Sequence, residues 1–309
     1  MDNMSESGIS RSMRVMLWTS HRCLSTVFTR SMGQIPGMEI WFEPYGYAYN
    51  AMLNVQLNDG IDLPTSYEGN EAIYIKASQY IGRMMSRTFQ PEGLSYEKLK
   101  KMLESSTAEM VFVKDIGLAM QRDDLRELIP KGYRHSFLIR HPLLMFSSLR
   151  KANYQHLKGN NILHEGETCE AEFDMRRHIE MNNPFDYYRS LYDLWKYIKE
   201  TIDPEPVILD ASDLQRNPSA VLPLYCKAVG LPFTNNMLGW ENAPLDDIQS
   251  WNTTCNINVQ TGFFEGVLST TRFSPPKDLP SRDELTPDVI ELADEALPFY
   301  EEMYKNRLH

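Results

Sequence analysis

The stretch WTSHRCLSTVFTRSM, residues 18–32, follows an apolar run and leads into a helix-compatible segment. The run at 15–17 predicts a buried strand, and the pair Ser25 and Thr26 stands where the helix is expected to begin. A loop between a buried strand and a helix points backbone N–H groups and the positive end of the helix dipole at one place. Arg22 adds a positive charge there, and charge-assisted hydrogen bonds are stronger than neutral ones. The stretch therefore predicts a loop that binds a phosphate.

This loop differs from the ordinary P-loop of ATP- and GTP-binding proteins. The P-loop motif G-x-x-x-x-G-K-[ST] relies on two glycines and a lysine, and the stretch at 18–32 contains neither residue type. The alternative interpretation is structural: Ser25 caps the helix and Arg22 lies on the surface. The loop alone does not decide between the two.

Short apolar runs recur along the chain, and helix-like or irregular segments separate them. This alternation is the βαβ signature of an α/β fold, in which helices flank a central parallel β-sheet as a three-layer sandwich. Strands are predicted at 13–18, 39–42, 109–113, 136–139 and 206–210. Helices are predicted at 70–87, 96–104 and 184–200, from Asn217, and after Thr286.

The chain of 309 residues is 42% hydrophobic and 11% aromatic, which is enough to bury a full core. We expect one domain at 13–309 after a disordered N-terminus at 1–12. The stretches 58–69 and 241–285 are rich in Gly, Pro, Asn, Thr and Ser, which predicts lid or binding loops. The sequence shows neither a signal peptide nor a membrane-spanning run, so a cytoplasmic protein without a membrane partner is expected.

The net charge and the cysteine content of the chain argue against some classes of function. The formal net charge of -11 argues against a nucleic-acid partner, which would require a basic face. An anionic ligand must then be held locally, by individual arginines and by helix N-termini. The 4 cysteines lie far apart without metal-binding spacing, so we expect reduced thiols and no metal site.

A second stretch, FLIRHPLLMFSSLRK at 137–151, supports the phosphate interpretation. Arg140 stands at the expected end of a strand, and Pro142 stands at the start of the next helix. Ser148 follows Arg140 by eight residues and falls inside that helix. An arginine and a serine so placed can both reach a second phosphate beside the first.

Together the two stretches resemble the nucleotide-binding elements of sulfotransferases that use 3′-phosphoadenosine 5′-phosphosulfate (PAPS). In that family a loop of the type P-[KR]-S-G-[ST]-T binds the 5′-phosphosulfate, and R-x-P-x(5)-S binds the 3′-phosphate. The first loop departs from its motif at three positions, and its cation is an arginine where the family usually has a lysine. The resemblance implies a cofactor site made by Arg22, Cys23, Leu24, Ser25, Thr26, Arg140 and Ser148.

The resemblance continues toward the C-terminus. The segment DASDLQRNPSAVLPLYCKAVGLPF at 210–233 is similar to the family's acidic strand end and the helix after it. MLGW at 237–240 and TGFF at 261–264 are similar to a diverged, sulfotransferase-like branch. The family's C-terminal loop covers the 3′-phosphate, which implies that role for Arg272. PAPS is then the cofactor, and its desulfated form PAP is a product.

Sulfuryl transfer requires a base near the acceptor and positive charge on the oxygen that leaves. Glu43 follows the second predicted strand, where some sulfotransferases present a glutamate base. Lys114 and Asp115 follow the third, where the family places a lysine and, two residues on, a histidine; here that position is Ile116. We therefore expect Glu43, and next Asp115, to act as the base, with Lys114 and Arg22 as the cations.

Two details of that assignment are open to test. Neighbouring aromatic residues are expected to desolvate Glu43 and raise its pKa. Lys114 is expected to pair with Asp115, which would make Asp115 an orienting group. His141 is interpreted as a loop residue beside the nucleotide, and His21 as a residue that fills the first loop.

The acceptor side of the site is expected to be aromatic. Pockets for small molecules are mostly apolar with a few polar groups, which favours a small alcohol, phenol or amine as acceptor, although core packing explains part of the pattern equally well. The aromatic residues around Glu43 are Trp41, Phe42, Tyr45, Tyr47 and Tyr49.

Two alternative functions are also compatible with parts of the sequence. The altered loop and the missing histidine are also typical of a protein that binds PAPS or PAP but has lost its chemistry. A small-molecule kinase on a P-loop fold would need a loop lysine, which is absent, and a carboxylate for Mg²⁺, for which Asp210 is the candidate. The sulfotransferase interpretation expects transfer without a metal.

Overall fold

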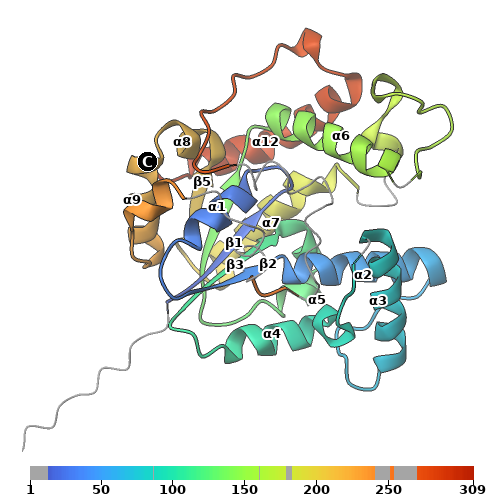
Figure 1. The fold of residues 1–309 in the computed structure, drawn as a ribbon, viewed down its shortest axis with the longest axis horizontal. Helices are drawn as coiled ribbons and strands as arrows, with labels where there is room; N and C mark the ends of the chain where they lie inside the picture. Colours follow the sequence, from blue (N-terminus) through green and yellow to red (C-terminus); the bar gives the residue numbers. More distant parts are fainter. Residues whose placement is uncertain (1–12, 86, 160, 179–182, 241–250, 254–269) are drawn as a thin grey trace, which may run out of the picture.

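The computed structural model describes residues 13–85, 87–159, 161–178, 183–240, 251–253 and 270–309 (Figure 1). The predicted N-terminal tail at 1–12, the TGFF segment and most of the loop at 241–285 lie outside these residues. No helix in the described ranges is both long and apolar enough to cross a membrane.

A five-stranded sheet forms the centre of the molecule, in the order β2-β3-β1-β4-β5. Each neighbouring pair of strands is parallel. The predicted α/β class with a central parallel sheet is therefore confirmed. The strands are β1 (Met13–Thr19), β2 (Met38–Phe42), β3 (Met110–Ile116), β4 (Arg134–Ile139) and β5 (Val207–Asp210).

The strands form where the apolar runs predict them because both faces of the sheet are covered. In β1 the four residues from Val15 to Trp18 are 0% exposed, and strands buried on both faces read as continuous apolar runs. The boundary that matters for the site differs from the prediction: β3 continues to Ile116. Lys114 and Asp115 thus lie inside the strand rather than after it.

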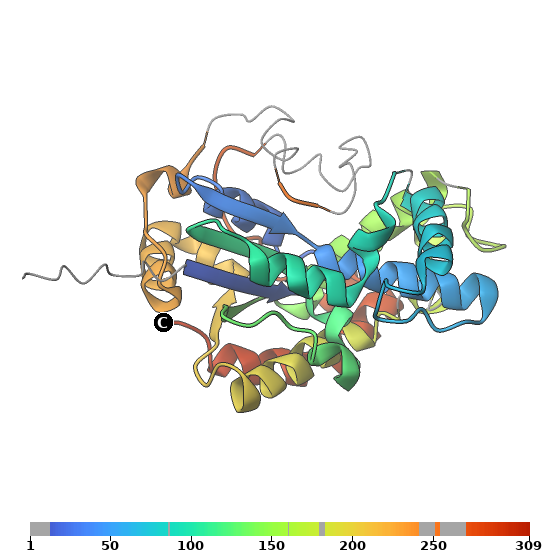
Figure 2. The ribbon, with the colours of Figure 1, turned by 90° about the horizontal axis from the view of Figure 1, so that it is seen from below.

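The predicted helices are confirmed, and α7 and α12 lie side by side below the sheet in Figure 2. α12 also contacts α6, β4 and β5. These helices are α1 (Ser25–Met32), α3 (Glu71–Met85), α4 (Tyr96–Ser105), α6 (Pro142–Gly159), α7 (Asp186–Thr201), α9 (Pro218–Val229) and α12 (Pro287–Lys305).

Helix α2 (Pro44–Asp59) was not predicted from the sequence. It buries nine residues, from Pro44 to Val55, so it lacks the polar face that marks an amphipathic helix. Gly60, in the left-handed conformation at φ 67°, ends the helix, and irregular backbone follows. The other short elements are α5 (Asp123–Arg126), α8 (Ala211–Arg216) and the 3-10 turns η1 (Pro91–Leu94), η2 (Gly117–Met120), η3 (Glu170–Glu172), η4 (Met175–Arg177), η5 (Asn235–Leu238) and η6 (Arg282–Glu284).

The strand order fixes where a ligand can bind. The chain leaves β1 toward β2 on one side and leaves β4 toward β5 on the other, although β1 and β4 are neighbours. Open α/β sheets bind ligands at such a switch point, outside the carboxyl ends of the strands. Both phosphate stretches cross this edge, because β1 ends at Thr19 and β4 ends at Ile139.

Close packing of η2 on α7 yields a test of the fold. A Cβ atom at Gly117 would lie 2.7 Å from Cδ1 and 3.1 Å from Cα of the buried Leu191. Overpacking of this kind costs about 1–3 kcal/mol, so Gly117→Ala should lower the urea midpoint of unfolding. Gly159→Ala is the matched control, because a Cβ at that position would have no described atom within 4 Å. Equal midpoints for the two variants would contradict the packing of α7 against η2.

Candidate functional site

The loop between β1 and α1 has a strained backbone. Arg22 has φ 59° and Leu24 has φ 70°, in the left-handed region that side chains other than glycine rarely adopt. Such conformations persist where the surrounding structure enforces them, often at binding sites. Ser25 is the first residue of α1 rather than its N-cap, so the capping interpretation is wrong.

The N-cap of α1 is Leu24, whose apolar side chain makes no capping hydrogen bond within the described chain. The first N–H groups of a helix have no acceptor inside the helix. At α1 they are therefore available to an external anion. Ser25 and Thr26 stand beside them in the first turn and line a cavity of about 250 Å³.

Arg140 joins the two phosphate stretches. Its Nη1 donates to the carbonyl oxygen of Arg22 at 2.9 Å, and Nε of Arg22 donates to Oγ of Ser148 at 3.1 Å. Burial, and next the charge of Arg140, lower the pKa of Arg22 from its usual value. Two cations held this close fit a site that receives an anion.

Two buried donors at this edge have no hydrogen-bond partner among the described residues. They are Nε of Arg140 and Oγ of Ser20. Arg140 as a whole is 9% exposed. Buried polar groups are normally paired, and an exception calls for an explanation such as a bound ion or water. A nucleotide phosphate matches this set of donors.

Glu43 and Lys114 form an ion pair in the wall of the same cavity. Lys114 is 3% exposed, and its Nζ also lies 4.7 Å from the centre of the Phe42 ring. Burial by itself raises the pKa of Glu43, but the charge and the hydrogen bond of Lys114, together with the charge of Arg87, outweigh it and hold that pKa below its usual value. The expected rise in the pKa of Glu43 is therefore wrong in direction.

Asp115 does not pair with Lys114 but holds the start of α2. Its carboxylate accepts hydrogen bonds from the backbone N–H groups of Tyr45 at 2.7 Å, Gly46 at 2.9 Å and Ile116 at 2.9 Å. Burial raises its pKa to about 7 against these hydrogen bonds. A carboxylate so used fixes the position of neighbouring Glu43 and has no free side toward an acceptor.

The cavity wall combines polar and apolar side chains. Its charged and polar members surround the ion pair of Glu43 and Lys114, and its apolar members come from α3, α6 and the segment before α7. The polar members include His21, Arg22, Ser25, Thr26, Asn50, Arg87 and Asn153, and the apolar members include Met84, Met85, Leu149, Leu157, Met175 and Pro184.

His21 and Arg87 belong to the site although the sequence analysis assigns them no role in the chemistry. Burial lowers the pKa of His21 to about 4 despite the opposing charge of Glu43, which leaves a neutral imidazole at pH 7. Nη1 of Arg87 donates to the hydroxyl of Tyr47 at 3.0 Å. His21 could have been identified as a site residue from the sequence, because it directly precedes Arg22 in the phosphate loop. No motif near Arg87 in the sequence identifies it as a site residue.

Other predicted site residues lie apart from the cavity. Cys23 is 0% exposed, and burial raises the pKa of its thiol to about 11. Arg272 is exposed and pairs with Gly239 through the backbone.

Two members of the expected aromatic wall, Phe42 and Tyr47, line the cavity. Trp41, Tyr45 and Tyr49 are buried and are not among its described lining residues.

Two candidates have structural roles. Nδ1 of His141 accepts from the backbone N–H of Leu143 at 3.3 Å, near the start of α6. Asp210 caps α8, accepting from the N–H groups of Ser212 and Asp213, and it also accepts from the hydroxyl of Tyr300 at 3.1 Å. A carboxylate committed in this way is a poor magnesium ligand, which weakens the kinase alternative.

No protein-family model matches the chain. Two Arabidopsis thaliana proteins are similar in sequence. The branched-chain-amino-acid aminotransferase-like protein 2 is 25% identical over 92% of this chain, and the aminotransferase-like protein 1 is 26% identical over 56%. The matches span 40% and 24% of the lengths of those relatives.

Several solved structures are similar in fold at low identity. The sulfotransferase from Alicyclobacillus acidocaldarius is matched with a TM-score of 0.49 and 12% identity, over 96% of this chain and 97% of that one. The sulfotransferase domain of the Synechococcus PCC 7002 olefin synthase gives 0.43 and 16%, over 91% and 93%. The sulfotransferase domain from the curacin biosynthetic pathway gives 0.43 and 14%, over 92% and 98%.

The neutral state of His21 yields a test of the site geometry. Between pH 6.5 and about 4 the unfolded chain binds a proton at His21 that the folded chain does not bind. This contribution to stability is therefore full at high pH and is lost as the pH falls through that window. From pH 7 to about pH 5, wild type should lose on the order of 1 kcal/mol more stability than His21→Gln. Identical pH profiles from urea unfolding would show that His21 is solvated.

Proposed function

We propose that the chain is a sulfotransferase that moves the sulfuryl group of PAPS to a hydroxyl or amine of a small-molecule acceptor. The observation that supports it most directly is the link between the two phosphate stretches at the switch point of the sheet. Arg140 bonds to the backbone of Arg22, Arg22 reaches Ser148, and both stretches adjoin the cavity that holds Glu43.

The residues present fit the two ends of the nucleotide. The N–H groups at the start of α1, with Ser25 and Thr26, are suited to the 5′-phosphosulfate. Arg140 and Ser148 are suited to the 3′-phosphate, which would satisfy the unpaired Nε of Arg140. When bound, PAPS supplies a sulfuryl group that passes to the acceptor atom as its bond to the 5′-phosphate oxygen breaks.

Glu43 is the proposed base. Lys114 keeps its carboxylate ionised, and 25% of the Glu43 side chain is exposed at the cavity. In the ionised form it can accept the proton that the acceptor hydroxyl or amine loses. Lys114 and Arg22 provide positive charge for the leaving oxygen, so transfer would need no metal. Asp115 acts as a positioning residue through α2, and neutral His21 is the second candidate base.

The apolar part of the wall supports a partly apolar acceptor. Methionine and leucine side chains form a flexible apolar lining, and tyrosine hydroxyls and asparagine amides add a few polar contacts. The acceptor proposed is therefore a small alcohol, phenol or amine with an apolar body.

The nucleotide assignment predicts that PAP binds and that ATP, which lacks a 3′-phosphate, does not. Arg140→Ala should weaken PAP binding about tenfold to a hundredfold in titration calorimetry, because a charged hydrogen bond is lost. Arg216→Ala, at an exposed arginine on α8, is the matched control and should bind as wild type. Unchanged PAP affinity in a folded Arg140→Ala variant would refute the assignment.

The base assignment predicts the effect of Glu43→Gln, which keeps the shape of the side chain and removes the basic oxygen. Turnover should fall about a hundredfold to ten-thousandfold while PAP affinity stays within about twofold of wild type. Asp115→Asn should instead lower the melting temperature, since its oxygens accept three backbone N–H groups.

Three results would redirect the proposal. Normal turnover in Glu43→Gln with loss in His21→Gln would move the base to His21. PAP binding without turnover on any acceptor would favour a protein that has lost its chemistry. A Schiff-base absorbance with pyridoxal phosphate, lost in Lys114→Ala, would favour the activity named in the aminotransferase-like relatives.

A further inference from the structure

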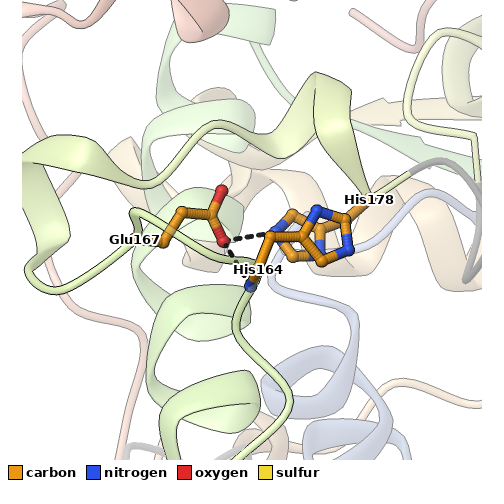
Figure 3. Close-up of side chains that lie close together, drawn as sticks. All are labelled: His164, Glu167 and His178. Atoms are coloured by element: carbon orange, nitrogen blue, oxygen red, sulfur yellow. Dashed lines mark hydrogen bonds and ion pairs between the residues drawn. The ribbon is translucent and has the colours of Figure 1, made fainter.

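Three side chains between α6 and α7 bring metal-ligating atoms together: His164, Glu167 and His178 (Figure 3). One ligand atom from each lies within 4.8 Å of the others. The two imidazole rings are stacked, with centroids 3.9 Å apart. Oε2 of Glu167 lies 2.8 Å from Nε2 of His178 and accepts from the backbone N–H of His164 at 3.1 Å.

The cluster contains a buried carboxylate whose second oxygen, Oε1 of Glu167, accepts from the backbone N–H of Asp174 at 3.3 Å. The side chain of Glu167 is 0% exposed and that of His178 is 6% exposed. Burying an ionised group is costly unless a cation or several donors compensate it. The nearby cation Arg177 is 3.7 Å from Glu167, but its side chain is 48% exposed. A metal ion bound by the two imidazoles and the carboxylate would add positive charge beside Glu167 inside the protein.

Neighbouring interactions hold the segment in place without a metal. Arg150 donates to the carbonyl oxygens of Glu170 at 2.6 Å and Phe173 at 2.5 Å, and it pairs with Asp288 on α12 at 3.3 Å. Asp288 also accepts from the backbone N–H of Met175 at 3.1 Å. The ligands thus lie on a segment that is already fixed to α12.

We propose that His164, Glu167 and His178 bind one transition-metal ion, with Zn²⁺ as the expected species. Two imidazoles and one carboxylate are a ligand set typical of zinc, and imidazole also suits Cu, Fe and Ni. The expectation of no metal site was based on the spacing of the cysteines. That spacing says nothing about a metal site made of histidine and glutamate ligands.

The ion would belong to the acceptor side of the cavity rather than to the phosphate loop. His178 and Met175 both line the cavity, so a metal at His178 would fix this part of its wall. The inference does not depend on which group the protein transfers, and it leaves the proposed transfer step free of metal.

The test is a metal titration of the full chain after dialysis against a chelator. Zn²⁺ calorimetry should give one ion per chain, and Co²⁺ should give visible d–d absorption of a four- or five-coordinate site without thiolate bands. His178→Ala and Glu167→Gln should each weaken Zn²⁺ binding by more than about tenfold, since even outer-shell partners of metal ligands have effects of that size.

Two further variants keep the result interpretable. His164→Ala removes one ligand but retains the contact between Glu167 and His178, so it should weaken binding in a chain that folds normally by circular dichroism. Cys169→Ser removes the exposed thiol of the same segment and should bind Zn²⁺ as wild type. Zn²⁺ should raise the melting temperature of wild type and of Cys169→Ser equally, and that of His164→Ala by less.

Other outcomes would overturn the proposal. These are the absence of a saturating Zn²⁺ or Co²⁺ site in the wild-type chain, and equal affinity in folded His164→Ala and wild type. Loss of binding in Cys169→Ser would assign the metal to a thiolate site instead.

Discussion

The hydrogen bond from Arg140 to the carbonyl oxygen of Arg22 ties together segments that are far apart in the sequence. It can form only because β1 and β4 are neighbours in the sheet although most of the first half of the domain separates them in the chain. The strand order therefore creates the site. A change in that order would leave both phosphate stretches intact in sequence and place them on different parts of the edge.

Charge at this edge is arranged by the pleat of the sheet. Successive residues of a strand point to opposite faces, so Lys114 and Asp115 cannot share a partner or pair with each other. Lys114 lies opposite Phe42 in the register and meets Glu43, the next residue along the chain after β2. Asp115 points the other way and meets the start of α2. One strand thus supplies a cation to the cavity and an anchor to the helix behind it.

Much of this fold can be predicted from the sequence, because both faces of the sheet are buried and its strands read as apolar runs. The two strand-to-helix loops at Arg22 and Arg140 can be predicted too, since a strand end and a helix start are adjacent in the chain. The partner of Lys114 could not, because it depended on where β3 ends, and a small difference in that boundary changed which side chains meet. Helix α2 was missed because residues 44–49 at its start are all buried and show no polar face. Arg87 and His178 join the cavity wall through tertiary contacts alone.

The left-handed backbone at Arg22 and Leu24 has a consequence for the thermodynamics of binding. A glycine-rich loop samples many conformations and loses that freedom when it closes on a phosphate. Here bulky residues are locked at unusual torsions by the fold, so the loss of conformational entropy occurs during folding and not on binding. Affinity at such a loop would come from a pre-organised set of donors. Glycine substitutions at Arg22 or Leu24 would relieve the backbone strain, but they would also make the loop flexible and weaken ligand binding.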